Sequence, residues 1–216
     1  MTAAVNIWYR ATDIDRKNIR IKADKKQDTV AAYVASLHVQ EWMRRNNFGQ
    51  VLNDWGRSLA RYGSSVLKFI EQDGKLKVSV TPWNRLISDT VDFENNPKIE
   101  LLWFTPAQLL KNKNYDQEIV QKLLEAREAR ETSEKVKKDN KNDYIQLYEV
   151  HGELPKSYLT GKIKDENEYV QQMHVVTFVA GKGKGKFDDF TLYAGKEAKD
   201  PYMITHLIQE DGRSMS

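Results

Sequence analysis

Two aspartates and a downstream Glu-x-Lys are the residues whose types could support metal-dependent chemistry in this sequence. Asp188 and Asp189 precede Glu197 and Lys199 by about nine residues. In two-strand nucleases, carboxylates in such an order hold Mg²⁺ while the lysine orients the attacking water. Here Glu197 and Lys199 stand in the stretch GKEAKDP, which is typical of a loop rather than of a buried strand. A metal-dependent nuclease is therefore an alternative function, and not the one that the sequence favours.

Glycine and lysine alternate in the stretch 181–186, which could contact phosphate groups. Lys182, Lys184 and Lys186 would supply positive charge, and glycine lets backbone N–H groups approach a phosphate closely. A P-loop, however, has four residues between its first glycine and Gly-Lys-Ser/Thr, and this stretch does not. The stretch is therefore expected to be a hairpin tip. Its functional alternative is a non-specific DNA-binding module that contacts the phosphate backbone.

The other residue types used in catalysis form no recognisable arrangement. The sequence contains no cysteine, which excludes thiolate nucleophiles, disulfides and cysteine-bound metals. The histidines at 38, 151, 174 and 206 lack the spacing of metal ligands, so each is expected to be a partly buried or surface residue. No Gly-x-Ser-x-Gly motif is present. The sequence therefore predicts a protein that is not an enzyme, without catalytic residues, bound metal or cofactor.

Composition indicates a folded protein with a heavily charged surface. Of the 216 residues, 40% are hydrophobic and 30% are charged, and the net charge is +3. Such a small positive excess does not by itself indicate a nucleic-acid-binding protein. No run approaches the roughly 18 apolar residues of a membrane span, and the first residues do not resemble a secretory signal. Neither a membrane partner nor export by a signal peptide is expected.

Hydrophobic periodicity predicts an α+β fold of mostly antiparallel strands, with two tandem helices near the N-terminus. The first helix should begin at Asp28 as N-cap, and the second should end at Tyr62-Gly63. Before them, Ile19 and Ile21 alternate with basic residues, as in a short peripheral strand. The apolar face of the first helix consists of Val30, Tyr33, Val34 and Leu37.

Alternating segments later in the chain predict the strands, beginning with a hairpin that turns at Asp73-Gly74. A helix expected from Tyr115 to about Lys138 has an apolar face only in its first half, so its charged second half should project into solvent. The predicted organisation is a peripheral segment at 1–27, one α+β domain at 28–207 and a truncated or disordered end at 208–216.

Some aromatic residues outside the expected core are candidates for contacts between subunits. Trp8 and Tyr9 lie in the N-terminal segment, where no core pattern surrounds them. Trp83 and Arg85 stand together after a predicted strand, and Trp and Arg are enriched in interface hot spots. A packed corner is the alternative interpretation of Trp83.

A series of short segments between Phe48 and Leu207 occurs in an informative order. An apolar helix ends in Tyr-Gly and runs directly into a strand that carries valine and lysine. A strand ending in Val-x-Pro and an Ile-x-Asp segment follow, and a later strand turns through glycine toward proline. The positions concerned are Trp55, Tyr62, Gly63, Val66, Lys68, Pro82, Asp89, Gly152 and Pro155. In this order they resemble the N-terminal wing region of tailed-bacteriophage portal proteins.

The resemblance implies a structural, non-enzymatic subunit of a homo-oligomeric ring, usually of about twelve copies, at the unique vertex of the capsid. Such a ring is assembled in the host cytoplasm and becomes part of the virion. It forms the conduit for double-stranded DNA during packaging and ejection, and it meets terminase, scaffold and capsid proteins. The family's stem and clip would follow Ser216, so the chain is expected to be a wing region.

Overall fold

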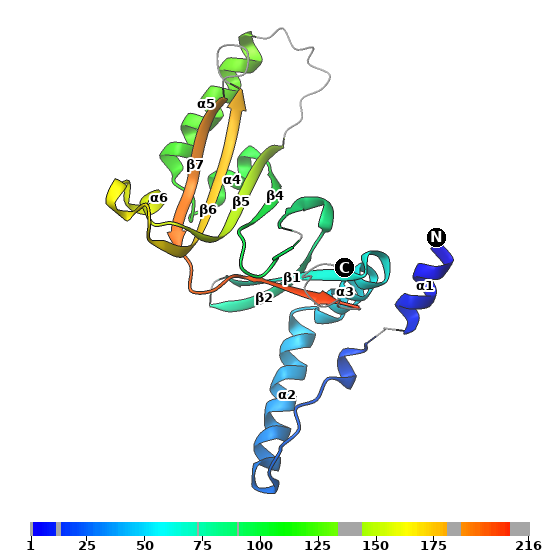
Figure 1. Cartoon of the computed structure of the whole chain (residues 1–216). Coiled ribbons are helices and arrows are strands. Elements are labelled where there is room, and N and C mark those ends of the chain that lie inside the picture. The colour runs from blue at the N-terminus through cyan, green and yellow to red at the C-terminus, as the bar shows by residue number, and fades with distance from the viewer. Residues whose placement is uncertain are drawn as a thin grey trace. The chain divides into compact units, whose positions relative to one another are not determined.

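The computed structural model describes residues 2–11, 14–72, 74–89, 91–133, 144–180 and 187–207. The chain divides into two compact units: unit 1 is Met1–Asn84 with Pro201–Ser216, and unit 2 is Arg85–Asp200 (Figure 1). The span 28–207, predicted as one domain, therefore contains parts of both units. Helices combine with two antiparallel sheets, which confirms the predicted α+β class.

Unit 1 contains helices α1 (Thr2–Ala11), α2 (Thr29–Arg45) and α3 (Phe48–Tyr62), with short 3-10 turns η1 (Arg16–Asn18) and η2 (Lys26–Asp28). The two tandem helices are confirmed. Asp28 lies at the N-cap of α2, but its side chain makes no capping hydrogen bond. Gly63 ends α3 in the left-handed conformation that favours glycine, with φ of 73°. The predicted strand around Ile21 is wrong, because this segment pairs with no strand.

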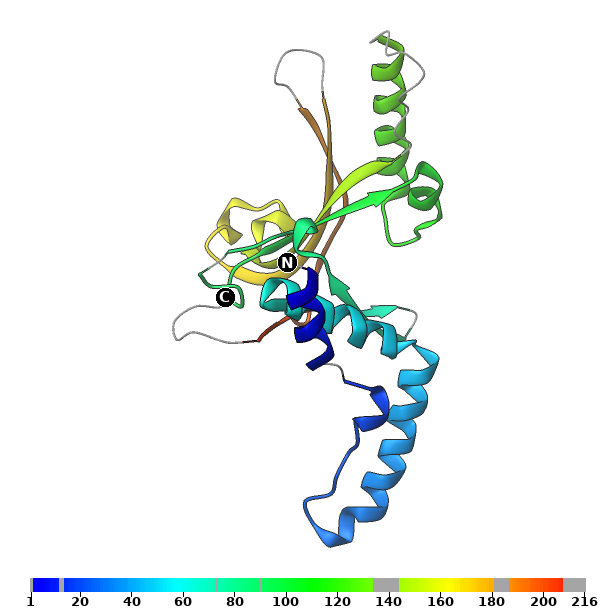
Figure 2. The same ribbon diagram turned by 90° about the vertical axis from the view of Figure 1, so that its right-hand side faces the viewer.

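The sheet of unit 1 has the strand order β2-β1-β8. The hairpin of β1 (Ser64–Gln72) and β2 (Lys75–Thr81) was predicted from its turn, and β8 (Tyr202–His206) joins it from the other end of the chain. Val66 in β1 faces both Thr81 and Ile204 and is fully buried. Helix α1 lies beside α3 (Figure 2).

Unit 2 is built on a five-stranded antiparallel sheet of order β3-β4-β5-β6-β7. Its strands are β3 (Leu86–Ile87), β4 (Lys98–Phe104), β5 (Ile145–Pro155), β6 (Tyr169–Ala180) and β7 (Phe187–Lys196). A 3-10 turn, η3 (Trp83–Arg85), precedes β3. The ladder between β6 and β7 shifts register between Val175 and Val176.

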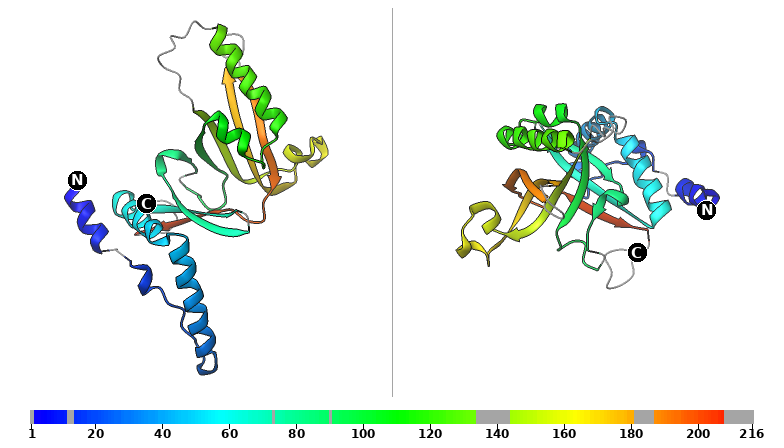
Figure 3. Two further views of the ribbon diagram at one scale, coloured as in Figure 1. Left: turned by 180° about the vertical axis from the view of Figure 1, so that it is seen from behind. Right: turned by 90° about the horizontal axis from the view of Figure 1, so that it is seen from above.

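Helices cover one face of this sheet (Figure 3). They are α4 (Pro106–Lys111), which Thr105 opens with a capping box, and α5 (Gln117–Ser133). Leu109, Val120 and Leu123 from these helices pack with Leu147, Val175 and Leu192 from the strands. The predicted extension of α5 to Lys138 falls outside the described residues. The connection from β5 to β6 contains α6 (Ser157–Thr160) and η5 (Ile163–Asp165).

Candidate functional site

A cluster of buried ionisable side chains lies on the helix-covered face of the unit 2 sheet. Alternation along β5 puts Ile145, Leu147, Glu149 and His151 on one face, and all four are buried. The first two belong to the apolar core beneath α4 and α5. The last two continue the same face but carry charge, and a buried charge is costly unless it is paired. Their partners therefore decide what the cluster can do.

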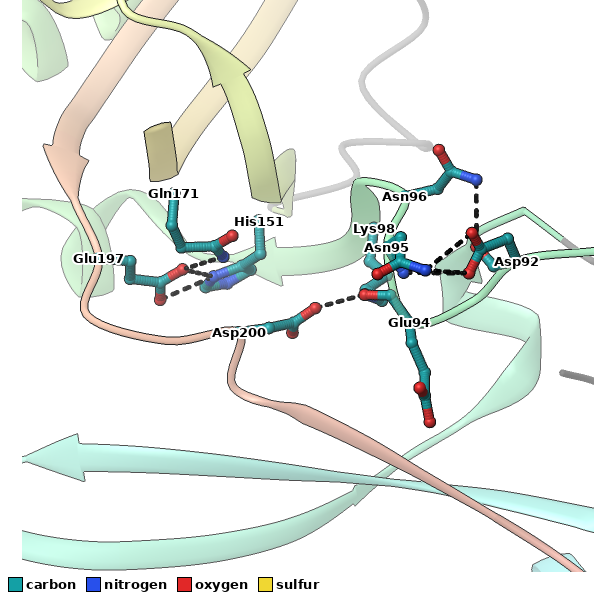
Figure 4. A network of polar contacts seen from close by, with 9 residues as sticks. All are labelled: Asp92, Glu94, Asn95, Asn96, Lys98, His151, Gln171, Glu197 and Asp200. Carbon is teal, nitrogen blue, oxygen red and sulfur yellow. Dashed lines mark hydrogen bonds and ion pairs between the residues drawn. The ribbon is translucent and has the colours of Figure 1, made fainter. Parts of the chain in front are cut away.

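His151 lies between the carboxylates of Glu149 and Glu197, and Figure 4 shows its contact with Glu197. Its Nε2 lies 2.5 Å from Oε1 of Glu149, and its Nδ1 lies 2.9 Å from both carboxylate oxygens of Glu197. The Gln171 amide also donates to Glu197, at 3.3 Å. Burial opposes the charged imidazole, but the hydrogen bonds and charges of the two carboxylates outweigh it and raise the pKa of His151. As an imidazolium, His151 donates from both nitrogens.

Lys98 forms a second polar contact nearby, in β4. Its side chain is 1% exposed, and its ammonium pairs with the carboxylate of Asp200 and donates to the Glu94 carbonyl at 3.1 Å. The same ammonium lies 4.9 Å from the centre of the Phe93 ring. Glu197 and Asp200 both belong to the segment that follows β7, so two ion pairs fasten this segment to the sheet (Figure 4).

The geometry of the cluster is that of a structural tether. Both ring nitrogens of His151 face carboxylates, and the residue is 2% exposed, so neither nitrogen is available to a substrate. Tyr115 also lacks the character of a catalytic acid or base, because burial and the charge of Glu149 raise its pKa to about 12. Among the described residues, no three acidic or histidine side chains are grouped as ligands for a metal ion.

The residues of the nuclease alternative do not come together. Asp188 and Asp189 lie at the start of β7, whereas Glu197 follows its other end. At about 3.3 Å of rise per residue, the strand holds Asp189 and Glu197 roughly 26 Å apart. Glu197 is instead the partner of His151, and Lys199 is exposed. The proposed phosphate contacts Lys182, Lys184 and Lys186 lie outside the described residues.

The candidate interface aromatics lie largely within unit 1. The Tyr9 hydroxyl donates to Asn53 at 3.3 Å, and its ring packs on Gly56 and beneath the guanidinium of Arg57. The indole of Trp83 donates to the Ser64 carbonyl at 3.1 Å, as expected of a packed corner. Trp8 lies in α1, and its side chain is outside the described part of the chain.

Arg85, the last of these candidates, belongs to unit 2. Its guanidinium lies 5.1 Å from the centre of the Trp103 ring, a cation–π contact. Trp103 remains 41% exposed, on the sheet face opposite the one that α4 and α5 cover. Arg85 and Trp103 are therefore available to a partner, unlike Tyr9 and Trp83.

Several of the positions on which the portal resemblance rests tolerate little change in the structure. A Cβ at Gly152, where φ is 152°, would lie 2.6 Å from the Pro97 Cα, so no larger residue fits. Lys68 is buried with its ammonium 5.3 Å from the centre of the Tyr202 ring. In the loop before β4, the Asp89 carboxylate accepts hydrogen bonds from the backbone N–H groups of Val91 and Asp92.

The remaining matched positions are Trp55, in the middle of α3, and residues at the ends of α3, β2 and β5. Trp55 is half-buried on α3 and Tyr62 is its last residue, exposed. Pro82 directly follows β2, and Pro155 ends β5. Their order along the chain is the one on which the resemblance rests.

The sequence does not predict the His151 cluster, and the expectation of a partly buried or surface histidine is wrong for His151, which is 2% exposed. Glu149 and His151 stand two residues apart in a predicted strand, a spacing that puts both side chains on one face. This signal identifies the pair, but nothing local identifies Glu197, which is 46 residues further along the chain.

No protein-family model matches this sequence, and no curated protein is significantly similar to it. Within the described ranges, no helix combines the length and apolar character needed to cross a membrane.

Proposed function

We propose that this chain is a structural subunit of a tailed-phage portal ring. In this role it occupies the unique vertex of the virion and forms part of the conduit assembly for packaging and ejecting double-stranded DNA. Copies of the chain bind one another, and terminase, scaffold and capsid proteins are its other partners. The function depends on shape and on contacts between copies, with no bond made or broken.

The order of the matched positions is the observation that carries this proposal. Helix α3 ends at Tyr62-Gly63 and β1 begins at the next residue, with Val66 and Lys68 buried in that strand. The later matched positions fall directly after β2, in the loop before β4, and within β5, where Gly152 pairs with Gln172 and does not form the expected turn. Val66 and Lys68 are therefore constrained by burial and Gly152 by its close approach to Pro97, whereas Tyr62, Pro82 and Asp89 are exposed.

The buried polar cluster supports the proposal indirectly. A ring subunit has to hold its own segments in place, and two ion pairs fasten residues 197–200 to the sheet. An enzyme needs ionisable groups that reach substrate, and here His151 and Lys98 are satisfied by the chain itself. The separation of Asp189 from Glu197 also disfavours the nuclease alternative.

Electron microscopy of the complete gene product tests the proposal. Purified protein should form closed rings with a central channel, and native mass spectrometry should give one dominant subunit number. A product that stays monomeric at high concentration would refute the ring. Cleavage of DNA with Mg²⁺ or Mn²⁺, lost in an Asp188→Asn/Asp189→Asn variant, would establish the nuclease alternative instead.

A further inference from the structure

Residues 16–26, here called the strap, run beside α2 and are fastened to it by side chains (Figure 1). The Ser36 hydroxyl accepts from the Ile21 N–H at 2.9 Å and donates to the Ile21 carbonyl at 3.0 Å. The Gln40 amide donates to the carbonyls of Arg16 and Ile19, at 3.1 and 2.7 Å. The strap thus has a fixed backbone although it belongs to no sheet.

The strap carries a concentrated positive charge that its one acidic residue, Asp24, offsets only in part. Its six basic residues and single aspartate give a net charge of +5. The basic residues are Arg16, Lys17, Arg20, Lys22, Lys25 and Lys26. Within the described part of the chain, none of these side chains forms an ion pair or hydrogen bond. Such a surface repels itself and attracts a negative partner.

An apolar stripe on α2 lies next to the strap. Val30 is 74% exposed, and Tyr33, Val34 and Leu37 along the same helix face are exposed as well. The helix carries no charged residue between Thr29 and Gln40. An uncharged apolar ridge beside a charged border has the composition of a protein interface with an apolar centre and a polar rim. A phosphate chain alone would satisfy the strap but leave this stripe in water.

Unit 2 presents a surface of opposite charge, the loop formed by residues 88–97. It contains Asp89, Asp92 and Glu94 and no basic residue. Within the described residues, Asp89 and Asp92 accept hydrogen bonds from neutral groups, and those from Asn95, together with the positive charge of Lys98, lower the pKa of Asp92. The Lys98 ammonium forms its ion pair with Asp200 (Figure 4). Ile87 and Val91, the latter 70% exposed, are the apolar residues of this surface.

We propose that the strap and stripe of one copy bind the acidic loop of a second copy. The strap offers five net positive charges where the loop offers three negative ones, and each surface has exposed apolar residues beside its charges. Because the two surfaces differ, the contact is head-to-tail and leaves one strap and one loop free in every dimer. Contacts of this kind extend into rings or filaments. The inference rests on the proposed ring and specifies how its subunits would meet.

Two variants that each lose one surface test the contact. Lys22→Glu/Lys25→Glu alters the strap, and Val91→Lys/Glu94→Lys alters the loop without removing the aspartates that hold it. A Lys162→Glu/Lys164→Glu variant is the matched control, because it changes the net charge as the strap variant does, at exposed positions in unit 2. Circular dichroism and a thermal melt establish that every variant is folded.

Sedimentation velocity at low and high salt measures the association. We expect the self-association constant to weaken roughly tenfold or more in the strap and loop variants, since each loses several charge contacts, and to stay unchanged in the control. A mixture of the two altered proteins should form a heterodimer, because the intact strap of one meets the intact loop of the other. This heterodimer should not grow further.

The inference would be overturned if the wild-type chain stays monomeric or if both altered proteins still self-associate. It would also be overturned if the mixture forms no heterodimer. A strap variant that loses only its affinity for double-stranded DNA would overturn it as well. Rings in electron micrographs that survive both variants would refute this contact and leave the portal proposal intact. Open filaments that both variants abolish would establish the contact and refute the closed ring.

Discussion

Replacing His151 by glutamine should remove much of the stability that the polar cluster gives to unit 2. The imidazolium donates to Glu149 and Glu197 from opposite sides of one ring. A glutamine amide can donate to one carboxylate, and its carbonyl then faces the other. Breaking a buried ion pair by removing one partner costs about 3–5 kcal/mol. Because Glu197 is partly solvated, we expect a loss of about 3 kcal/mol in the free energy of unfolding.

The loss should depend on pH in a defined direction. The carboxylates raise the pKa of His151 above its usual value of about 6.5. A group with a raised pKa stabilises the folded state fully below its unfolded pKa, and the stabilisation disappears as pH rises through the folded pKa. The difference between wild type and His151→Gln should therefore be largest below about pH 6.5 and shrink as pH rises through the raised pKa of folded His151.

Urea denaturation at pH 6, 7.5 and 9, combined with hydrogen exchange of unit 2, measures this effect. His38→Gln is the matched control, because His38 is exposed on α2 and its replacement should change stability by no more than about 0.5 kcal/mol. Two results would refute a charged His151 paired with both carboxylates: a His151→Gln protein as stable as wild type, or a stability difference between the two proteins that does not vary with pH.

Three further substitutions test other parts of the structure by the same measurements. Gly152→Ala should cost about 2 kcal/mol or more, because the new methyl group meets the Pro97 backbone at a positive φ; a neutral result would contradict that close approach. Leu123→Ala should cost about 2–5 kcal/mol in the core, whereas the same change at exposed Leu110 should cost less than about 1 kcal/mol. Lys98→Met should cost about 2 kcal/mol, since its carboxylate partner is partly exposed and can regain water; no loss would show that the ion pair is dispensable.

The sequence predicts the ends of secondary-structure elements well where a neighbouring residue determines the end directly. Gly63 after an apolar helix gave the end of α3, and Thr105 before a proline gave the start of α4. The predicted hairpin of β1 and β2 is present, and Gly74 between the strands has a positive φ of 68°. Each of these features depends on residues within a few positions of one another, so the sequence contains all the information needed.

Features that depend on distant residues could not be predicted in this way. The pairing of β8 with β1 joins the two ends of the chain, and alternation alone does not choose a partner strand. The periodicity of α2 correctly indicated an apolar face, but Val30 and Leu37 on that face are exposed. A hydrophobic period shows which residues share a face and leaves open what covers it.

Buried and exposed charged groups of the chain differ in their partners. His151 and Lys98 lie inside unit 2, and each has a charged partner from its own chain. Exposed charges gather on the strap, where they are positive, and around Glu94, where they are negative. A catalytic site requires perturbed groups left open inside a cleft, and His151 and Lys98 are not of this kind. In the proposed contact between copies, attraction between exposed surfaces of opposite sign would steer association and exclude misaligned contacts.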